Sequence, residues 1–499
     1  MILRAFYKEQ TYEKQVVSFK PALQNGHNAG MVKTFFVMFL LEASFIKTII
    51  VGGGKVGQSL AQQLLLEEYD VTIVDRSSRV VEQARTTLDI IGIVGNGAAY
   101  PVLESAGAKD ADLLIALTAS DETNMLCCLT AHQLGAKHTI ARVRSPEYYD
   151  QLFFLKECLG LSMAVNPELA AAEEITRILR FPSATKVEIF ARGRVELVSY
   201  HVTESNGLCG TILSDLPHKT GIKVLICVVE HGDNVVIPSG NYRIAADDTL
   251  YFTGAPEQIV AAFRKLGLLT ERVQNVLIIG GGRISYYLAT QLAKDKIHVK
   301  IIEKDAARAV ELASLLPKAN VLQGDASNHE LLMEEGLNRQ DAFVALTGLD
   351  EGNILSSIYA HHLRVPKVIA KVNNDNLVSL IHDGGLESII SPKRITTSQI
   401  LRFARALSAG RDREDILALY QIVGGRVEVM EFRAASAAYC DMPLKTLPIR
   451  PNILIACIVR QGKTIIPNGD DVIQQDDSVL VVTAGQRLIR LADILQGNV

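Results

Sequence analysis

The stretch "KTIIVGGGKVGQSLAQQL" (Lys47–Leu64) decides the fold of this chain. Its apolar run ends in Gly52, and Gly52, Gly54 and Gly57 give the spacing GxGxxG at the start of a helical pattern. The first glycine allows a tight turn, the second lets a phosphate approach the backbone, and the third permits close packing of helix on strand. Asp75 ends the next apolar run, at the place where a carboxylate can accept hydrogen bonds from ribose hydroxyls. This context predicts a dinucleotide-binding unit rather than an ornamental glycine turn with a solvated aspartate.

The same unit occurs a second time. The stretch "NVLIIGGGRISYYLATQL" (Asn275–Leu292) matches the first, so that Gly280 corresponds to Gly52. The tails "IPSGNYRIAADDTLYFTG" (237–254) and "IPNGDDVIQQDDSVLVVTAG" (466–485) also match each other. A repeat of this length predicts two copies of one multi-domain unit.

Short apolar runs alternate with helical patterns in the first half. The runs cover residues 48–51, 71–74, 90–94, 113–117 and 139–143 and are typical of buried parallel strands. Two helical patterns place apolar residues on one face that we expect to be buried: Leu60, Ala61, Leu64 and Leu65 in one, and Met125, Leu126 and Leu129 in the other. The alternation predicts an α/β fold class with a Rossmann-like, doubly wound parallel sheet in each half.

Each Rossmann-like domain is followed by a different kind of sequence. Helical patterns near 167–181 and 399–407 mark the boundaries, and β-rich runs follow the first of them at 186–190, 195–202, 224–229 and 249–253. These runs predict a small α/β domain after each sheet. The expected domains are 47–166 and 274–392 (Rossmann type) and 183–267 and 413–497 (small type), after an N-terminal extension over 1–46.

The extension contains an apolar stretch from Phe35 to Leu41 that Glu42 interrupts. This stretch is too short to span a bilayer, for which about 18 apolar residues are needed. Three interpretations remain open: a translation start assigned upstream of the true one, an accessory segment, or an export signal.

Composition excludes several functions. The 499 residues carry a formal net charge of −4, which gives no basic field for nucleic acid. The seven cysteines form no CxxC pairs or zinc-site spacings, so we expect reduced thiols of a cytoplasmic protein and no metal site. Cys227 and Cys457 lie inside apolar runs and should be buried as small hydrophobes. No general acid or base recurs in both halves outside the loops, so we expect no catalytic residues and no enzyme.

The candidate cofactor-binding residues follow from the two loops and the strand ends. In the first half they are Gly52, Gly54, Lys55, Val56, Gly57, Asp75, Asn96 and Thr118. In the second half they are Gly280, Gly282, Arg283, Ile284, Glu303 and Asp325. Lys55 and Arg283 occupy matching positions where a cation can face phosphates, with surface solubility as the alternative explanation. A carboxylate at position 75 disfavours NADP because it would repel the 2′-phosphate.

Two features leave alternatives open. Ser285 replaces the third glycine of the second loop, so this loop is either a functional site with altered binding or a structural relic. Thr118, Ser120, Asp121, Glu122 and Asn124 follow the fourth apolar run, at the sheet edge where ligands bind, but Ser120 or Asp121 can equally begin a helix as its cap.

The stretches "IIVGGGKVGQSLA", "DETNMLCCLTAHQLGA" and "ARVRSPEYYD", together with the paired tails, resemble the RCK (KTN) domain family that regulates potassium transport. The resemblance runs from about Lys47 to the C-terminus and covers two pairs of RCK N-terminal and C-terminal domains, in the order found in the regulatory subunits of Trk-type uptake systems.

This resemblance implies a peripheral cytoplasmic regulator on the inner face of the cell membrane. It implies binding of NAD(H), and of ATP or ADP, and control of a separate integral-membrane Trk-type potassium transporter subunit. It adds Arg76 and Arg142 to the expected contacts, with Lys371 at the position of Arg142 in the second half. It further implies homo-oligomers, either dimers or tetramers. The competing hypotheses are an RCK-type regulator of another cation channel or exchanger, and an NAD-dependent oxidoreductase.

Overall fold

The computed structural model describes residues 46–180, 186–204, 207–232, 234–268, 273–374, 376–377, 388–409, 416–436, 438–486, 488 and 490–496. The predicted extension over 1–46 lies outside the described residues except for Ile46, as do the connections at 181–185, 269–272 and 410–415. The chain divides into two compact units, Met1–Asn166 and Pro167–Val499. Each unit is described by itself.

Strand β1 (Lys47–Val51) lies inside a six-stranded sheet with the order β3-β2-β1-β4-β5-β6. The other strands are β2 (Asp70–Asp75), β3 (Ile91–Val94), β4 (Leu113–Ala116), β5 (His138–Arg142) and β6 (Met163–Val165). All neighbours run parallel. The order reverses between β1 and β4, which is the switch point at which open sheets bind ligands. The predicted fold class is confirmed.

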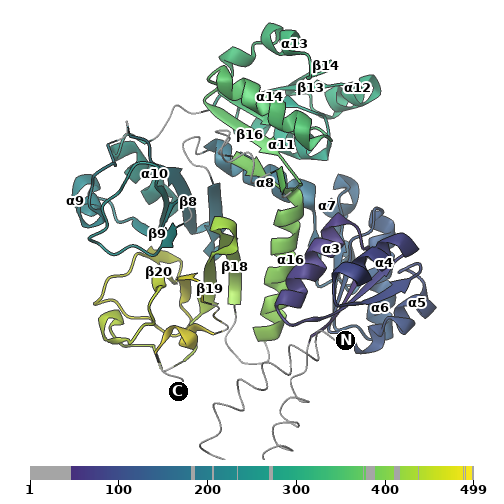
Figure 1. Cartoon of the computed structure of the whole chain (residues 1–499), viewed down its shortest axis with the longest axis horizontal. Coiled ribbons are helices and arrows are strands. Elements are labelled where there is room, and N and C mark those ends of the chain that lie inside the picture. The colour runs from purple at the N-terminus through teal and green to yellow at the C-terminus, as the bar shows by residue number, and fades with distance from the viewer. Residues whose placement is uncertain are drawn as a thin grey trace, which may run out of the picture. The chain divides into compact units, whose positions relative to one another are not determined.

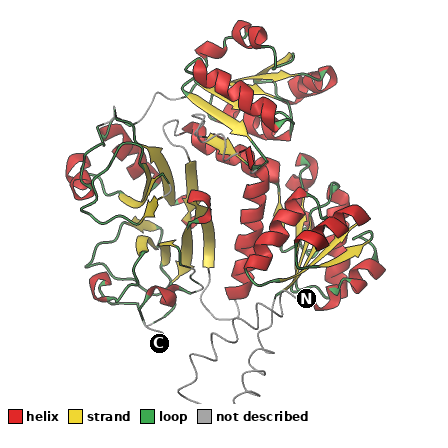
Figure 2. Cartoon of the chain, viewed as in Figure 1, coloured by secondary structure: helices red, strands yellow, loops and turns green. Residues whose placement is uncertain are grey.

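Helices connect these strands (Figures 1 and 2). They are α3 (Lys55–Leu66), α4 (Ser78–Thr87), α5 (Tyr100–Ser105), α6 (Asp121–Leu134) and α7 (Pro146–Leu155). Helix α3 packs on β1 and β2, and α6 packs on β4 and β5. The predicted face of α3 is confirmed, since Leu60, Ala61 and Leu64 are completely buried.

The predicted face of α6 is wrong. Leu126 is 50% exposed, and the buried residues of this helix include Asn124, Cys127, Cys128 and Ala131. The small side chains on the buried side let α6 approach β4 and β5 closely. The Asn124 amide holds the helix there through hydrogen bonds to the strand ends, where a large apolar side chain was expected. The leucine on the opposite side is left at the surface.

The second parallel sheet repeats the first, with the order β14-β13-β12-β15-β16-β17. Its strands are β12 (Asn275–Ile279), β13 (His298–Glu303), β14 (Ala319–Gln323), β15 (Ala342–Ala345), β16 (Lys367–Lys371) and β17 (Ser388–Ile390). Its helices include α11 (Arg283–Lys294), α12 (Ala306–Leu315), α13 (His329–Glu334) and α14 (Asp350–His362). The strand order and register therefore place both glycine loops at equivalent switch points.

The two small domains are antiparallel sheets. The first has the order β10-β9-β11-β8-β7, with strands β7 (Lys186–Phe190), β8 (Val195–His201), β9 (Leu225–His231), β10 (Asn234–Val236) and β11 (Thr249–Gly254), and helices α9 (Leu216–Thr220) and α10 (Pro256–Lys265). The second has the order β18-β19-β22-β20-β21, with strands β18 (Ile416–Ile422), β19 (Val427–Arg433), β20 (Ile453–Arg460), β21 (Lys463–Ile465) and β22 (Ser478–Ala484).

These two sheets share one hydrophobic core. Phe190 and Val228 of the first domain belong to the same buried cluster as Val427 and Val482 of the second. Cys227 and Cys457 are completely buried in it, as predicted, and burial raises the pKa of each thiol to about 12. The Arg426 guanidinium also pairs with the Glu230 carboxylate at 3.0 Å. The small domains of the two repeats are therefore one packed body.

Helix α8 (Pro167–Arg180) ends the first Rossmann-type sequence but packs along α11 of the second. Its Ile175 side chain lies in one buried cluster with Leu288 and Leu292. The Thr176 hydroxyl donates to Gln291 Oε1 at 2.7 Å, and Arg180 pairs with Asp295 at 3.0 Å. Helix α16 (Pro392–Ala409), longer than the predicted 399–407, also contacts α8. The unit boundary after Asn166 follows from this crossover.

We expect Ile175→Ala to loosen the second Rossmann-type domain. The change leaves a void in a fully buried site, and such truncations cost about 2–5 kcal/mol. Hydrogen exchange should therefore become faster at the amides of α11, although the substituted residue belongs to the first repeat. Val310→Ala, on the exposed side of α12, is the matched control. Unchanged α11 exchange in Ile175→Ala would contradict the packing of α8 on this helix.

Candidate functional site

The first glycine loop joins β1 to α3 with almost no room for side chains. Gly52 has φ +105°, and a Cβ added there would lie 2.9 Å from the Leu117 carbonyl carbon. A Cβ added at Gly57 would lie 2.0 Å from the Gly52 carbonyl oxygen. A Cβ at Gly54, in contrast, meets nothing within 4 Å. Two glycines are thus required by packing, and the third keeps the outer side of the loop open.

The open side of the loop is the N-terminus of α3. Gly54 is the N-cap residue, and no side chain caps the helix. The first-turn N–H groups and the helix dipole therefore favour an anion at this point. Lys55 is exposed beside them and Val56 is half-buried. The sequence-predicted residues Gly52 to Gly57 are thus brought together as one turn around an uncapped helix N-terminus.

Asp75 fastens this loop to the end of β2. Its Oδ2 accepts from the Gly53 N–H at 2.8 Å, and its Oδ1 accepts from the Ser77 N–H at 2.8 Å. A carboxylate has about four acceptor positions, so each oxygen keeps capacity for a further hydroxyl donor. The backbone therefore holds Asp75 in place beside the glycine loop.

Arg76 and Asn96 come together at the ends of β2 and β3. The Arg76 guanidinium donates to Asn96 Oδ1 at 2.9 Å, and the Ala98 N–H donates to the same oxygen at 3.3 Å. Within the described residues, Arg76 forms no ion pair with a carboxylate. The guanidinium next to Asp75 is therefore held by an amide oxygen instead of a carboxylate partner.

Asn124 holds the other side of the switch point. It is completely buried, and its Oδ1 accepts from the Thr118 N–H at 2.8 Å and from the Thr118 hydroxyl at 2.7 Å. Its Nδ2 donates to the Arg142 carbonyl at 2.8 Å, and Arg142 itself donates to the Thr118 carbonyl at 2.6 Å. Asn124 thus fixes the ends of β4 and β5, and the predicted site residues Thr118 and Arg142 are bonded within the protein.

Capping accounts for the neighbouring polar residues. The Ser120 hydroxyl accepts from the Thr123 N–H at 3.0 Å, which makes it the N-cap of α6. Asp121 Oδ2 accepts from the N–H groups of Arg144 and Ser145, each at 2.8 Å. The two alternatives for this segment were ligand binding and helix capping. The bonds of Ser120 and Asp121 agree with a structural role.

The second glycine loop has the same construction. Gly280 has φ +91°, and Gly282 is the uncapped N-cap residue of α11, directly before Arg283 and Ile284. Glu303 accepts from the Gly281 N–H, and its Oε1 accepts from the Asp305 N–H at 2.7 Å. Asn353 repeats Asn124, since its Oδ1 accepts from the Thr347 hydroxyl at 2.7 Å. The machinery of the first loop is therefore preserved in the second.

Ser285 is accommodated inside the protein. It is completely buried, and its hydroxyl donates to the Gly280 carbonyl oxygen. In the first loop the corresponding space is closed, because Gly57 and the Gly52 carbonyl touch. The serine thus changes the contact between helix and strand and does not enter the outer side of the loop.

Charges distinguish the second site from the first. Lys304, at the position of Arg76, pairs with Asp325 at 2.7 Å, and this lysine lowers the pKa of the Asp325 carboxyl to about 2. Arg308, whose Nε donates to the Gly281 carbonyl at 2.9 Å, pairs with Glu311 at 2.7 Å. The second site therefore contains two ion pairs, Lys304 with Asp325 and Arg308 with Glu311. The corresponding residues of the first site are Arg76 with Asn96, and Val80 with Gln83.

Two further positions separate the sites. Asn373 stands where the first half has Arg144, the partner of Asp121 at 3.6 Å. Lys371 replaces Arg142, and burial lowers the pKa of its ammonium group. The second site is therefore more negative than the first. Sequence analysis missed the cation at the position of Val80 and the carboxylate at the position of Gln83, although comparing the two halves position by position would have found both.

The described residues contain no group of three His, Cys, Asp or Glu side chains that could hold a metal ion. Among the helices the structure describes, none has the length and apolarity needed to cross a membrane.

Comparison with known families gives two domain types. The TrkA-N domain family matches residues 48–167 and 276–392, and the TrkA-C domain family matches residues 197–267 and 429–496. The matches alternate along the chain, and each TrkA-N match covers one of the parallel sheets with its glycine loop.

Curated relatives match most of the chain. The Trk system potassium uptake protein TrkA homolog 1 of Methanosarcina mazei is 33% identical over 445 residues, which is 87% of this chain and 97% of the relative. The Trk system potassium uptake protein TrkA of Halomonas elongata is 33% identical over 452 residues, which is 89% of this chain and 97% of the relative.

Solved structures share the fold. The RCK domain of GsuK has a TM-score of 0.59 and 17% identity, and the match covers 89% of this chain and 93% of that chain. The GsuK channel bound to NAD has a TM-score of 0.58 and 18% identity, covering 91% of this chain and 82% of that chain.

We expect Gly57→Ala to destabilise the first Rossmann-type domain. A methyl group 2.0 Å from the Gly52 carbonyl must push α3 away from β1. Overpacking of this kind costs about 1–3 kcal/mol, which thermal unfolding should detect. Gly54→Ala in the same loop is the matched control, since its φ of −69° suits alanine and its surroundings are open. Equal melting temperatures for the two variants would contradict the packing argument.

Proposed function

The chain belongs to the TrkA family of Trk system potassium uptake proteins, and we propose that it is the nucleotide-binding regulatory subunit of such a system. The observation that carries this proposal is the doubled order of sheet and small domain, with an uncapped glycine loop and a fixed carboxylate in each parallel sheet. The partner is an integral-membrane potassium transporter, and the subunit acts at its cytoplasmic face.

NAD(H) is the proposed ligand of the first site. Its pyrophosphate would lie against the α3 N-terminus at Gly54 and Lys55, and Asp75 would accept from the adenosine ribose. Arg76 and Asn96 stand beside the place of the adenine. ADP and ATP contain the same adenosine and phosphate groups, so they compete for these residues. The GsuK channel, which has the same fold, has been solved bound to NAD.

Regulation requires only linkage. A ligand that binds one arrangement of the assembly more tightly than another shifts the populations of the two arrangements. A difference of about 1.4 kcal/mol in binding free energy changes their ratio tenfold. No covalent step is needed, and we propose that the chain is not an enzyme. Dimers or tetramers of the chain would present such arrangements to the transporter.

The charge difference between the sites predicts different ligand preferences. ATP carries more negative charge than NADH, so the ion-paired second site should discriminate against ATP more strongly than the first site does. The first site, with an Arg76 that no carboxylate neutralises, is the proposed site for the more highly charged nucleotides.

We expect Gly54→Ala to weaken NADH binding by at least about tenfold, because the methyl group occupies the side of the loop that a phosphate must approach. Stability should remain near that of the wild type. Isothermal titration of the full chain measures the affinity, and potassium uptake with the co-expressed transporter should lose its response to nucleotide. Gly282→Ala makes the same change in the second loop and should leave the first site's affinity intact. Unchanged NADH affinity in Gly54→Ala would remove this site from the proposal.

We expect Asn96→Asp to lower ATP affinity about two- to fivefold and to lower NADH affinity less. The new carboxylate would pair with Arg76 as Asp325 pairs with Lys304, and exposed pairs are worth about 0.2–1 kcal/mol. The effect should shrink with rising salt.

The reverse change in the second site is Asp325→Asn, which should raise the ATP affinity of that site. It is measured in a chain whose first site is weakened by Gly54→Ala. Asp110→Asn, away from both sites, controls for net charge. Equal effects on ATP and NADH would contradict the electrostatic explanation.

Consumption of NADH by the purified chain would favour the oxidoreductase alternative. The other alternative is an RCK-type regulator of a different cation channel or exchanger. It would be favoured if Gly54→Ala abolished the nucleotide control of such a co-expressed protein and left potassium uptake unaffected.

A further inference from the structure

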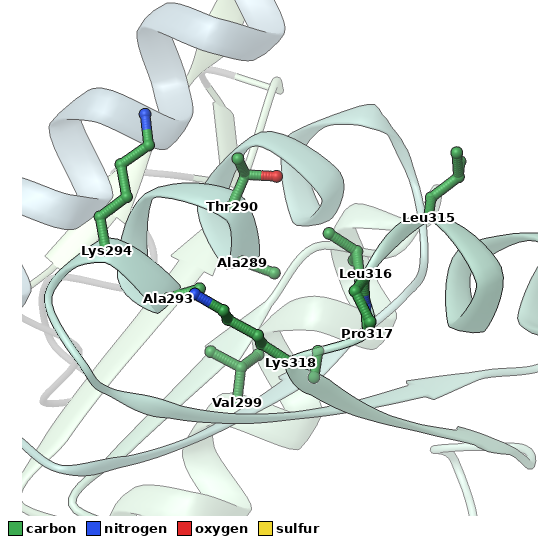
Figure 3. A pocket seen from close by; sticks show the side chains of 10 residues that line it. Ala289, Thr290, Ala293, Lys294, Val299, Leu315, Leu316, Pro317 and Lys318 are labelled. Carbon is green, nitrogen blue, oxygen red and sulfur yellow. The ribbon is translucent and has the colours of Figure 1, made fainter.

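A cavity of about 260 Å³ opens on the second Rossmann-type domain, at the edge of the sheet opposite the glycine loop (Figure 3). It lies between the C-terminal half of α11, the beginning of β13 and the loop that joins α12 to β14. Because it borders the amino ends of the strands, it is separate from both nucleotide sites, which lie at the carboxyl ends.

One difference between the repeats at this cavity is an extra residue. When the two repeats are aligned on Gly52 and Gly280, the helix caps Leu88 and Leu316 coincide, and Lys300 coincides with Thr72. Thr72 pairs with Ile91 in the first sheet, whereas Lys300 pairs with Asn320, one position beyond the counterpart of Ile91. The extra residue therefore lies between Leu316 and Asn320, within the loop that lines the cavity.

The second difference is a smaller side chain. Ala293 lines the cavity at the position where the first repeat has Leu65. Replacing a leucine by an alanine removes apolar volume that the surroundings fill only in part. Two independent changes, one in the loop and one on α11, thus act on the same place in the second repeat.

The lining combines an apolar wall with a cationic mouth. The wall includes Ala289, Val299 and Leu316. Lys318 crosses the mouth toward Ala293, whereas Lys294 points away from the cavity (Figure 3). Within the described part of the chain, neither lysine forms an ion pair with a carboxylate. An ammonium group over an apolar hollow suits a molecule with an apolar body and an anionic head.

We propose that this cavity binds a small amphipathic anion, with its apolar body against α11 and its carboxylate or phosphate head at Lys318. An apolar cavity of about 150 Å³ holds a benzene molecule, so the space here suits a body of about ten non-hydrogen atoms. The occupant would touch the helix that carries Gly282 at its N-terminus and packs against α8. The source is either a free amphiphile or the exposed part of a membrane lipid, which share this chemistry.

Titration of the full chain with octanoate tests the proposal. We expect one molecule to bind at about millimolar concentration, as its size allows. Acetate has the head without the body, 1-octanol has the body without the charge, and both should bind at least about tenfold more weakly. Co-sedimentation with phosphatidylglycerol vesicles separates the two sources. Binding to vesicles through this cavity identifies a lipid, and binding of octanoate without vesicle binding identifies a free amphiphile.

Substitutions in the lining test whether octanoate binds in this cavity. Ala293→Leu introduces the residue of the first repeat and should abolish octanoate binding, with the melting temperature and the hydrogen exchange of the α11 amides retained as evidence of an intact fold. Lys318→Gln should weaken octanoate binding by about three- to tenfold through loss of the charge–charge contact, while Lys294→Gln should have less effect. Lys109→Gln, on the first repeat, is the neutral control. Octanoate binding that is absent in the wild type, unchanged in Ala293→Leu, or matched by 1-octanol would overturn the proposal.

Discussion

The close approach of Gly57 to the Gly52 carbonyl oxygen is the constraint on which the first glycine loop depends. Because no side chain fits between them, α3 begins directly at the end of β1, and its uncapped N–H groups face outward at the switch point of the sheet. Asp75 then bonds to the Gly53 N–H and fixes the loop from the next strand. The uncapped helix N-terminus and the Asp75 carboxylate are thereby fixed close together by the backbone, and preorganisation of this kind lowers the cost of binding a ligand.

The strands and glycine loops could be predicted from the sequence because their signals are local. A strand buried on both faces is a continuous apolar run, and a glycine at φ +105° has few substitutes. The face of α6 was predicted wrongly because its buried side is made of small residues and of Asn124, whose hydrogen bonds to Thr118 and Arg142 exist only in the folded sheet. The docking of α8 on α11 had no sequence signal either, since an amphipathic helix does not specify which of two similar sheets it covers.

The two repeats differ by pairs of residues. Arg76 with Asn96 corresponds to Lys304 with Asp325, and Val80 with Gln83 corresponds to Arg308 with Glu311, so each carboxylate that occurs only in the second repeat lies beside a cation. The small domains show the same behaviour. His231 bonds to the buried Asp248 at 2.8 Å in the first, where Arg460 pairs with the buried Asp477 at 2.8 Å in the second. A buried aspartate left without its partner is costly, so both members of such a pair are constrained together. The fold is thus the same in both halves while the charges around the two glycine loops differ.

The packing also limits where a regulatory movement can occur. The small domains share one hydrophobic core that includes the completely buried Cys227 and Cys457, so separating them would expose a large apolar area. The connection through α8 is different in kind. This helix follows the first sheet in the chain, yet its Ile175 and Thr176 lie against α11, whose N-terminus is the second glycine loop. A displacement of α11 would therefore change its packing against α8 within the second unit. Since α16 contacts α8 as well, these three helices form a connected layer beside the second glycine loop, and a movement in this unit has to be accommodated there.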